Sequence, residues 1–292
     1  MAIVPISERD GYIWLNGEFI EWKKAQIHIL THSLHYGGAV FEGIKAYNGK
    51  IFRLEEHINR LFKSAAILKY RPDFSKEQLC RAAEQLLVLN NLKDAYIRPL
   101  LWKGSQSQRI NSPMLSINAS IAAWDVSSLE YRKPDLTLLI STFQKASNKA
   151  LPANCKSSAN YQMAAVAQLD AMEEGYDDAL LLDQEGFVAE CTTSNIFFVE
   201  KDKLFTPIPD SALMGITRQA VIEIAKKIGI SIEEIRITEE DLSKFTECFV
   251  TGTAIEVKPV TSITLLDKQR ISYKNDSITP KIISAYKDLV IS

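Results

Sequence analysis

The chain has 292 residues, of which 46% are hydrophobic and 24% charged, and its formal net charge is −2. This length allows one large domain or two ordinary ones, and the hydrophobic fraction suffices for a buried core. The sequence contains no apolar run long enough to span a bilayer, no basic block that indicates nucleic acid, and no secretory signal pattern at its start. Four scattered cysteines without a CxxC pair are typical of reduced thiols, so we expect a cytoplasmic globular protein.

The first half of the chain mixes hairpins and helices. Two Asn-Gly turns predict hairpins and two apolar runs predict strands, which cover residues 12–20, 47–52, 95–102 and 116–124. Apolar residues at helical spacing predict a helix over residues 58–68. Ser75 and Gln78 resemble a capping box that opens a second helix. We therefore expect a smaller α+β domain over residues 1–125.

The second half begins after a polar stretch. Residues 126–135 are rich in polar and charged side chains and predict an interdomain linker. The remaining residues, 136–292, contain many short apolar runs with turn signals between them. Helices are expected in this half at about 161–175, 216–229 and 278–290. Many short strands in one block indicate a closed or barrel-like sheet in this larger domain.

The most informative stretch begins at Glu190, shortly after a turn at residues 183–186 that joins two apolar runs. It is followed by a helix that starts at Ile216, with Gly215 just before it and the Thr217 hydroxyl beside its first turn. Backbone N–H groups at such a helix end attract phosphate. A carboxylate on a strand and a phosphate-ready helix end, a short hairpin apart, suggest that a flat anionic cofactor lies between them.

This stretch, with its spacings, resembles the class IV aminotransferase signature. The matching blocks are ECTTSNIF (190–197) and LMGITR (213–218). Other blocks, in family order, are similar to those of branched-chain aminotransferases: HYGGAVFEG (35–43), AYIRPL (95–100), KSSANY (156–161) and TGTAIEV (251–257). The resemblance implies a two-domain, fold-type-IV enzyme that uses pyridoxal 5'-phosphate, with a smaller N-terminal domain and a larger, barrel-like C-terminal domain. It also implies a homodimer or a larger homo-oligomer built from dimers.

Pyridoxal-phosphate chemistry needs a lysine amine to form a Schiff base with the cofactor aldehyde. Lys156 has small or apolar neighbours, and desolvation would lower its pKa and supply the uncharged amine. From its surroundings alone, Lys156 would be an ordinary loop lysine before a helix. The resemblance assigns it the Schiff base and the catalytic proton transfer.

The resemblance places Glu190 at the pyridine nitrogen, where an anion keeps the ring protonated. The apolar residues around Glu190 indicate a buried sheet, in which an unpaired carboxylate is costly, so we expect this carboxylate to have a partner.

The phosphate is expected to bind to a helix end, a glycine turn and an arginine. The resemblance implies these cofactor-binding residues: Arg60, Leu213, Gly215, Ile216, Thr217 and Thr253. The helical pattern alone predicts a solvated helix face for Arg60. The turn at Gly252 can present consecutive N–H groups to an anion. Tyr161 is expected to hydrogen-bond the phenolic oxygen of the ring.

The substrate is expected to meet a second group of residues. The resemblance implies that Tyr96, with the Thr253 and Ala254 amides, holds the α-carboxylate. It also implies that Arg98 recognises a second carboxylate. Alternation along a strand puts Tyr96 and Arg98 on one face, as a shared pocket needs. The remaining substrate residues are the wall residues Tyr36 and Phe41 and, in the polar loop 104–111, Arg109.

The expected reaction is transamination between a branched-chain L-amino acid and 2-oxoglutarate. A D-amino-acid aminotransferase, an R-selective amine transaminase and an aminodeoxychorismate lyase are alternatives of the same fold. A remote alternative is a metalloenzyme, because the spacing of His28, His32 and His35 would put three imidazoles on one helical face. No nearby carboxylate or cysteine completes that set, so no metal is expected.

Overall fold

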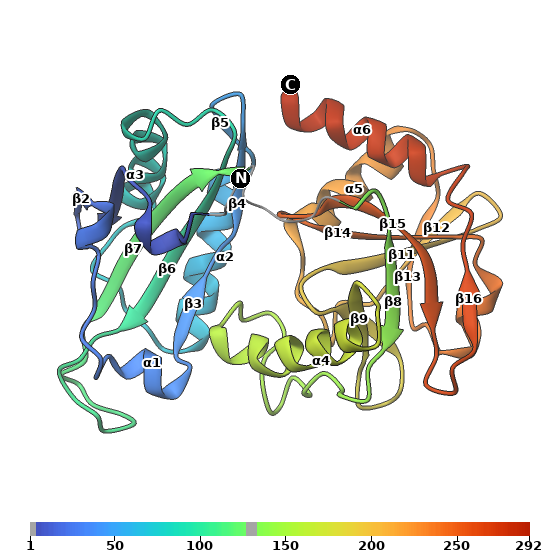
Figure 1. Cartoon of the computed structure of the whole chain (residues 1–292), viewed down its shortest axis with the longest axis horizontal. Helices are drawn as coiled ribbons and strands as arrows, with labels where there is room; N and C mark the ends of the chain where they lie inside the picture. Colours follow the sequence, from blue (N-terminus) through green and yellow to red (C-terminus); the bar gives the residue numbers. More distant parts are fainter. Residues whose placement is uncertain (1–3, 127–132) are drawn as a thin grey trace. The chain divides into compact units, whose positions relative to one another are not determined.

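The computed structural model describes residues 4–126 and 133–292. The chain divides into two compact units. Unit 1 comprises Met1–Glu130 and Cys155–Ala159, and unit 2 comprises Tyr131–Asn154 and Asn160–Ser292. Each unit has its own sheet and helices (Figure 1). The predicted linker lies largely in residues 127–132, outside the described residues, and the predicted domain boundaries stay a prediction.

Within the described residues, unit 1 is built on a seven-stranded sheet with the order β2-β1-β7-β6-β4-β5, and β3 pairs with β6. The strands are β1 (Tyr12–Leu15), β2 (Glu18–Glu21), β3 (Ala39–Phe41), β4 (Ile44–Tyr47), β5 (Lys50–Ile51), β6 (Ala95–Lys103) and β7 (Ile117–Asp125). Their pairs are antiparallel. Both predicted hairpins are confirmed, and Asn16 and Asn48 adopt φ values of 50° and 49° in their turns.

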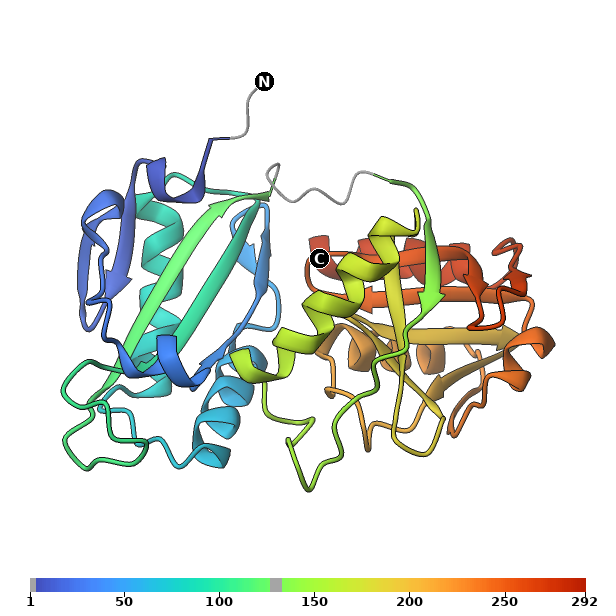
Figure 2. The ribbon, with the colours of Figure 1, turned by 60° about the horizontal axis from the view of Figure 1, so that its bottom comes forward.

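Helices α2 and α3 pack against the sheet of unit 1 (Figures 1 and 2). The helices of this unit are α1 (His32–Tyr36), α2 (Leu54–Ile67), α3 (Lys76–Leu89) and the 3-10 turns η1 (Ile6–Glu8) and η2 (Trp22–Lys24). The predicted capping box of Ser75 and Gln78 opens α3 and is confirmed. The apolar faces of α2 and α3 and residues of the sheet form one buried core.

In the described part of unit 2, nine strands form one sheet with the order β10-β9-β8-β15-β14-β11-β12-β13, and β16 pairs with β15. The strands are β8 (Leu136–Ile140), β9 (Asp178–Leu182), β10 (Val188–Cys191), β11 (Asn195–Glu200), β12 (Lys203–Pro207), β13 (Ile232–Ile235), β14 (Glu247–Gly252), β15 (Glu256–Thr264) and β16 (Arg270–Ser272). Strand β10 contacts β11 and β12, although these strands lie far from it in the sheet order. The sheet therefore curls back on itself, as the predicted barrel-like domain requires, and the α+β class is confirmed.

Three long helices cover the sheet of unit 2. The helices are α4 (Gln162–Glu173), α5 (Ile216–Lys227), α6 (Thr279–Ile291) and the 3-10 turn η5 (Glu240–Lys244). The 3-10 turn η4 (Ser158–Tyr161) begins in unit 1 and ends in unit 2. Leu138 and Ile140 of β8 face the interior of the sheet, whereas Leu139 between them packs against α4. This is the period of two that a strand imposes. No helix of residues 4–126 and 133–292 is long and apolar enough to cross a membrane.

Asp178, at the start of β9, is a buried carboxyl group in unit 2. Burial raises its pKa to about 6, although hydrogen bonds that the carboxyl accepts from Thr192, Ala179 and Gln168 oppose this shift. The charged form is therefore disfavoured in the folded protein.

We expect Asp178→Asn to change how the stability of the protein depends on pH. A raised folded pKa stabilises the fold below the unfolded value of 3.8, and this contribution is lost as the pH rises through 6. Between pH 5 and pH 8 the free energy of unfolding of the wild-type protein should fall by about 1.4 kcal/mol more than that of the variant. Urea unfolding of both proteins at the two pH values measures this difference, and an identical pH dependence would contradict the assignment.

Candidate active site

Lys156 lies in a segment that the backbone fixes within unit 1. Its carbonyl oxygen accepts a hydrogen bond of 3.1 Å from the N–H of Phe41, and its N–H donates to Ser64 Oγ of α2 at 3.0 Å. The next residue, Ser157, forms a β-bridge with Val40. The Lys156 side chain is half-buried, and its Nζ lies 4.9 Å from the centroid of the Phe41 ring. The backbone of the predicted catalytic lysine is thus hydrogen-bonded to both β3 and α2.

Phe41 contacts Arg98, and Gly43 leaves room for Tyr96; both Arg98 and Tyr96 were predicted to bind substrate. The Arg98 guanidinium lies 4.8 Å from the centroid of the Phe41 ring, a cation–π distance, so Phe41 contacts both Arg98 and Lys156. A Cβ atom on Gly43 would lie 1.9 Å from the hydroxyl oxygen of Tyr96. Only glycine at this position allows Tyr96 to come so close.

Arg60 does not lie on a solvated helix face, so that expectation from the helical pattern is wrong. Its side chain is 14% exposed, and its Nε and Nη2 donate to Glu42 Oε1 and Oε2 at 2.7 and 2.8 Å. His57, one turn earlier on α2, lies with Nδ1 2.8 Å from Glu42 Oε2. Burial opposes ionisation of Glu42, but the charge of Arg60 and the hydrogen bonds from Arg60 and His57 lower its pKa to about 2.

Tyr96 and Arg98 share one face of β6, as predicted. Arg98 Nη2 donates to the Tyr96 hydroxyl at 3.3 Å. The Tyr96 ring is buried and lies 5.2 Å, centroid to centroid, from the ring of Trp124. Arg98 Nε is buried and has no hydrogen-bond partner among the residues that the structure describes. The Tyr96 ring, packed against Trp124, therefore lies beside the Arg98 guanidinium, whose Nε still has a hydrogen bond to donate.

Tyr36 and Arg109 lie where α1 meets the loop after β6. Tyr36 is 47% exposed, and its hydroxyl donates to the carbonyl oxygen of Gln108 at 3.0 Å. Arg109 is exposed, and its carbonyl oxygen lies 3.2 Å from His32 Nε2. These contacts tie both residues to α1 and the loop rather than to the Phe41 ring.

The three histidines of the metal alternative do not share a helical face, because α1 begins only at His32. His28 accepts a hydrogen bond from a backbone N–H, whereas His32 and His35 each contact a backbone carbonyl. Across 4–126 and 133–292 there is no group of three or more His, Cys, Asp or Glu residues that could hold a metal ion. The helical geometry on which this alternative depended is therefore wrong.

Glu190 lies in unit 2 and is buried and partnered, as predicted. Its side chain is 10% exposed, and Lys145 Nζ lies 2.7 Å from Oε1. Oε2 accepts hydrogen bonds from Asn195 Nδ2 at 3.3 Å and from the Leu213 N–H at 3.2 Å. These contacts hold the carboxylate in one orientation at the end of β10.

Asn195 also fixes the start of α5. Its Nδ2 donates to the carbonyl oxygen of Leu213 at 2.9 Å. A Cβ atom on Gly215, the N-cap of α5, would lie 2.0 Å from Asn195 Oδ1, which explains the glycine there. Thr217, in the first turn of α5, is buried. One amide side chain thus links Glu190 to the helix end that was predicted to bind phosphate.

The turn between β14 and β15 contains Thr253 and Ala254, as predicted. Close to it, the hydroxyls of Ser194 and Thr251 are buried and lack a hydrogen-bond partner within the described part of the chain. Buried hydroxyls of this kind need an acceptor, and an anion would provide one. Tyr161 is half-buried and is the N-cap of α4.

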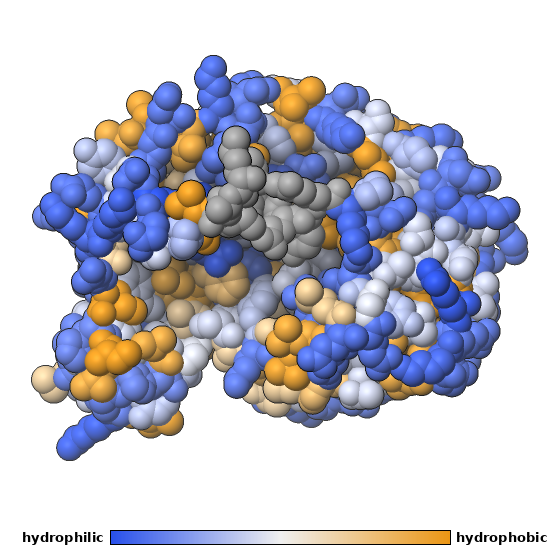
Figure 3. Space-filling model, viewed as in Figure 1, coloured by the Kyte–Doolittle hydropathy of each residue, from blue (hydrophilic) through white to orange (hydrophobic). Residues whose placement is uncertain are grey.

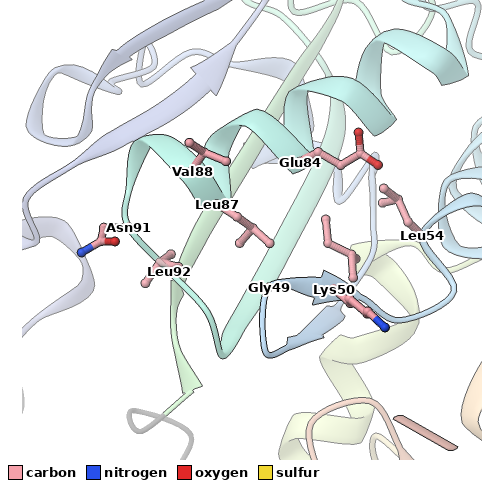
Figure 4. Close-up of a pocket in the computed structure, with 9 residues that line it drawn as sticks. Gly49, Lys50, Leu54, Glu84, Leu87, Val88, Asn91 and Leu92 are labelled. Atoms are coloured by element: carbon pink, nitrogen blue, oxygen red, sulfur yellow. The ribbon is translucent and has the colours of Figure 1, made fainter. Parts of the chain in front are cut away.

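A separate cavity of about 680 Å³ in unit 1 lies between the end of α3 and the turn from β4 to β5 (Figure 4). Its lining residues are Gly49, Lys50, Ile51, Leu54, Glu84, Leu87, Val88, Asn91 and Leu92. None of the residues predicted to bind cofactor or substrate is among them. This cavity is therefore not the candidate active site.

Comparison with known proteins decides the family. Residues 39–263 match the model of the amino-transferase class IV family. The chain belongs to this family. This aminotransferase is 45% identical over 290 residues to a probable branched-chain-amino-acid aminotransferase of Rickettsia felis, and the match covers 99% of each chain. It is 35% identical over 266 residues to the branched-chain-amino-acid aminotransferase of Escherichia coli K12, covering 88% and 86%.

Solved structures agree with this assignment. The crystal structure of the Escherichia coli branched-chain amino acid aminotransferase matches with a TM-score of 0.88 at 34% identity, over 97% and 95% of the two chains. The T.th. branched-chain amino acid aminotransferase with pyridoxamine 5'-phosphate matches with a TM-score of 0.90 at 36% identity, with the same coverage. The aminotransferase therefore has the fold-type-IV architecture that the sequence predicted.

The side chains of the aminotransferase fit pyridoxal 5'-phosphate chemically. Unit 1 offers an amine at Lys156 for an aldehyde and a guanidinium at Arg60 for a phosphate. Unit 2 offers the Glu190 carboxylate for a protonated ring nitrogen. The start of α5 and the unpartnered Ser194 and Thr251 hydroxyls offer donors to an anion.

The sequence did not identify the residues that hold this donor set in place. Lys145, Glu42 and His57 were given no role, because each has its partner 15 or more positions away along the chain. Asn195 was also given no role, although it lies only 5 positions from Glu190. The one local signal was the spacing of His57 and Arg60, which puts both side chains on one face of α2.

Proposed function

We propose that this aminotransferase transfers the amino group of leucine, isoleucine or valine, in the L-form, to 2-oxoglutarate. The products are a branched 2-oxo acid and L-glutamate. The names of the relatives support this reaction, and similar T.th. structures are complexed with 4-methylvaleric acid and with N-(5'-phosphopyridoxyl)-L-glutamate. The observation that carries the proposal is the pairing of the Phe41 ring with the Arg98 guanidinium beside Lys156. Such a pair accepts both an aliphatic side chain and a carboxylate.

Bound pyridoxal 5'-phosphate supplies an aldehyde that captures the amino group and a ring that withdraws electrons from the substrate Cα. In our proposal, Lys156 would hold the aldehyde covalently, and its amine would move the proton from the substrate Cα. Glu190 would keep the proton on the ring nitrogen. Tyr161 donates a hydrogen bond to the phenolic oxygen. The residues that bind the phosphate are Arg60, Leu213, Gly215, Ile216, Thr217 and Thr253.

The same proposal assigns the substrate contacts. The Tyr96 hydroxyl and the amides of Thr253 and Ala254 bind the α-carboxylate. Arg98 binds the second carboxylate of glutamate or 2-oxoglutarate. Phe41 and Tyr36 form the apolar wall, and Arg109 is the alternative residue for the second carboxylate.

We further propose that the enzyme is a homodimer, or a larger assembly of dimers, in the cytoplasm, where it serves branched-chain amino-acid biosynthesis. Large apolar side chains are exposed around α1 and the loop after β6: Ile27, Ile29, Leu30, Leu34, Ile110 and Met114. Figure 3 shows apolar side chains gathered over this end of unit 1. Exposed apolar patches favour association with another protein surface. Among the described residues, Cys80, Cys191 and Cys248 are thiols outside any disulfide, which supports a reducing compartment.

A panel of amino donors tests the proposed reaction. The L- and D-forms of leucine, isoleucine, valine and glutamate, together with a chiral primary amine, are each supplied with 2-oxoglutarate. We expect turnover with the L-branched donors and with L-glutamate. Turnover with D-amino acids alone, or with the amine alone, would instead support the D-amino-acid or the R-selective amine alternative. Release of pyruvate from aminodeoxychorismate without amino transfer would support the lyase.

Arg98→Ala should lower the efficiency of the half-reaction with glutamate much more than that with leucine. The glutamate side chain carries a carboxylate that leucine lacks, and a charge-assisted contact is worth roughly 1.5–3 kcal/mol. The selective loss should therefore be about tenfold or more in the efficiency of the half-reaction. Stopped-flow measurement of the half-reactions with leucine and glutamate gives this ratio.

Arg109→Ala is the comparison variant, because Arg109 is the rival candidate for this carboxylate and lies exposed in the loop after β6. We expect little selectivity between the two donors in this variant. Equal losses for both donors in Arg98→Ala would remove Arg98 from substrate selection. A glutamate-specific loss in Arg109→Ala alone would move the recognition to the loop.

A further inference from the structure

Glu42 is a fully buried carboxylate, with 0% of its surface exposed. Burying a charge is costly unless it is paired and hydrogen-bonded. A buried ion pair often contributes no more to stability than apolar residues of similar volume, so its presence calls for another explanation. Glu42 follows directly on β3, beside the residue that holds the backbone of Lys156.

The pairing of Glu42 with Arg60 is side-on. Oε1 accepts from Nε at 2.7 Å, and Oε2 accepts from Nη2 at 2.8 Å. Two parallel hydrogen bonds fix the plane of a guanidinium as well as its position. A guanidinium has five N–H donors, and the donors on its other edge are directed away from a carboxylate bound in this way. Because Glu42 fixes the guanidinium plane, the donors on that edge of Arg60 can point towards a second anion in one orientation only.

His57 completes this arrangement. Burial lowers the pKa of His57, although Glu42 opposes the shift, so the ring is neutral. Because the Glu42 carboxylate only accepts hydrogen bonds, His57 Nδ1 must carry the proton and donate it to Oε2. Glu42 and Arg60 thus form a neutral pair, which His57 orients without adding charge.

We propose that Glu42 is a positioning residue for the cofactor phosphate: it fixes the Arg60 guanidinium in the orientation in which its outer edge binds the phosphate. This inference rests on the proposed function, in which Arg60 binds that phosphate. Phe41 holds the Lys156 carbonyl and the next residue holds Arg60. Two consecutive residues therefore set the covalent anchor and the phosphate anchor of the cofactor relative to one another.

The test is a double-mutant cycle on cofactor affinity. The full-length protein, freed of cofactor, is titrated with pyridoxal 5'-phosphate, and the dissociation constant is measured for the wild type, Glu42→Gln, Arg60→Gln and the double variant. An amide at position 42 turns an N–H group towards donors of Arg60 or His57. Each single variant should weaken binding about tenfold or more. The double variant should bind no more weakly than Arg60→Gln alone, because Glu42 acts through Arg60.

Two further measurements separate positioning from a structural role. The phosphorus NMR shift of the bound cofactor should move in the same direction in Glu42→Gln and in Arg60→Gln. Glu55 is an exposed glutamate on α2, the helix that carries Arg60. Glu55→Gln should leave both the cofactor affinity and the phosphorus shift unchanged. If Glu42→Gln does not fold, His57→Gln perturbs the same carboxylate from its other side and should weaken binding by a smaller factor.

Additive losses in the double variant, with Arg60→Gln itself weakened, would overturn the positioning role and leave the phosphate role of Arg60 intact. Unchanged affinity in Arg60→Gln would overturn both roles. Neither result bears on whether the wild-type protein transaminates branched-chain donors, which the donor panel decides separately.

Discussion

Lys156→Ala should still bind pyridoxal 5'-phosphate but lose turnover by orders of magnitude. The proposed phosphate contacts at Arg60 and at the start of α5 do not involve Lys156, so we expect them to hold the cofactor without it. By the same proposal, the variant lacks both the covalent anchor and the base that moves the proton from the substrate Cα. General acid–base catalysis alone contributes roughly 10²–10⁴-fold, so a loss of at least this size is expected in kcat.

Steady-state and single-turnover rates with L-leucine measure this loss. Lys149→Ala is a suitable control, because Lys149 is an exposed lysine in the same segment of the chain. It should behave like the wild type. Activity of Lys156→Ala within a few fold of the wild type would show that another amine carries the reaction.

Glu190→Gln should slow removal of the Cα proton while the cofactor stays attached to Lys156. The amide has no charge to hold the proton on the ring nitrogen, so the ring withdraws electrons less strongly. It also turns an N–H group towards Lys145 Nζ, Asn195 Nδ2 or the Leu213 N–H, all of which donate to the wild-type carboxylate. A fall of about two pKa units at the ring nitrogen corresponds to about 3 kcal/mol, or roughly a hundredfold in rate.

Single-turnover absorbance with L-leucine, with and without deuterium at Cα, isolates this step. Glu185→Gln, an exposed glutamate in the turn before β10, serves as the control and should keep the wild-type rate. A proton-removal rate in Glu190→Gln close to that of the wild type would show that Glu190 does not serve the ring nitrogen.

Much of the fold could be predicted because its signals are local. The Asn-Gly turns formed both hairpins, and the capping box at Ser75 opened α3. The apolar neighbours of Glu190 correctly indicated a buried carboxylate with a partner. In each case the residues that determine the structure lie within a few positions of one another.

The contacts that orient the site could not be predicted, because they join distant residues. Lys145 and Glu190 are separated by 45 positions, and Glu42 and Arg60 by 18. Helical periodicity put Arg60 on a solvated face, since periodicity cannot detect a buried anion that comes from outside the helix, here Glu42 between β3 and β4. The spacing of the three histidines suggested a helix that in fact begins only at His32.

If Lys156 holds the cofactor, reduction with borohydride should fix the cofactor covalently on this residue. The purified protein is reduced with its cofactor bound and digested, and the labelled peptide is sequenced by mass spectrometry. We expect one pyridoxyl label, on the peptide that contains Lys156. A label on another lysine, such as Lys45, would contradict this role of Lys156.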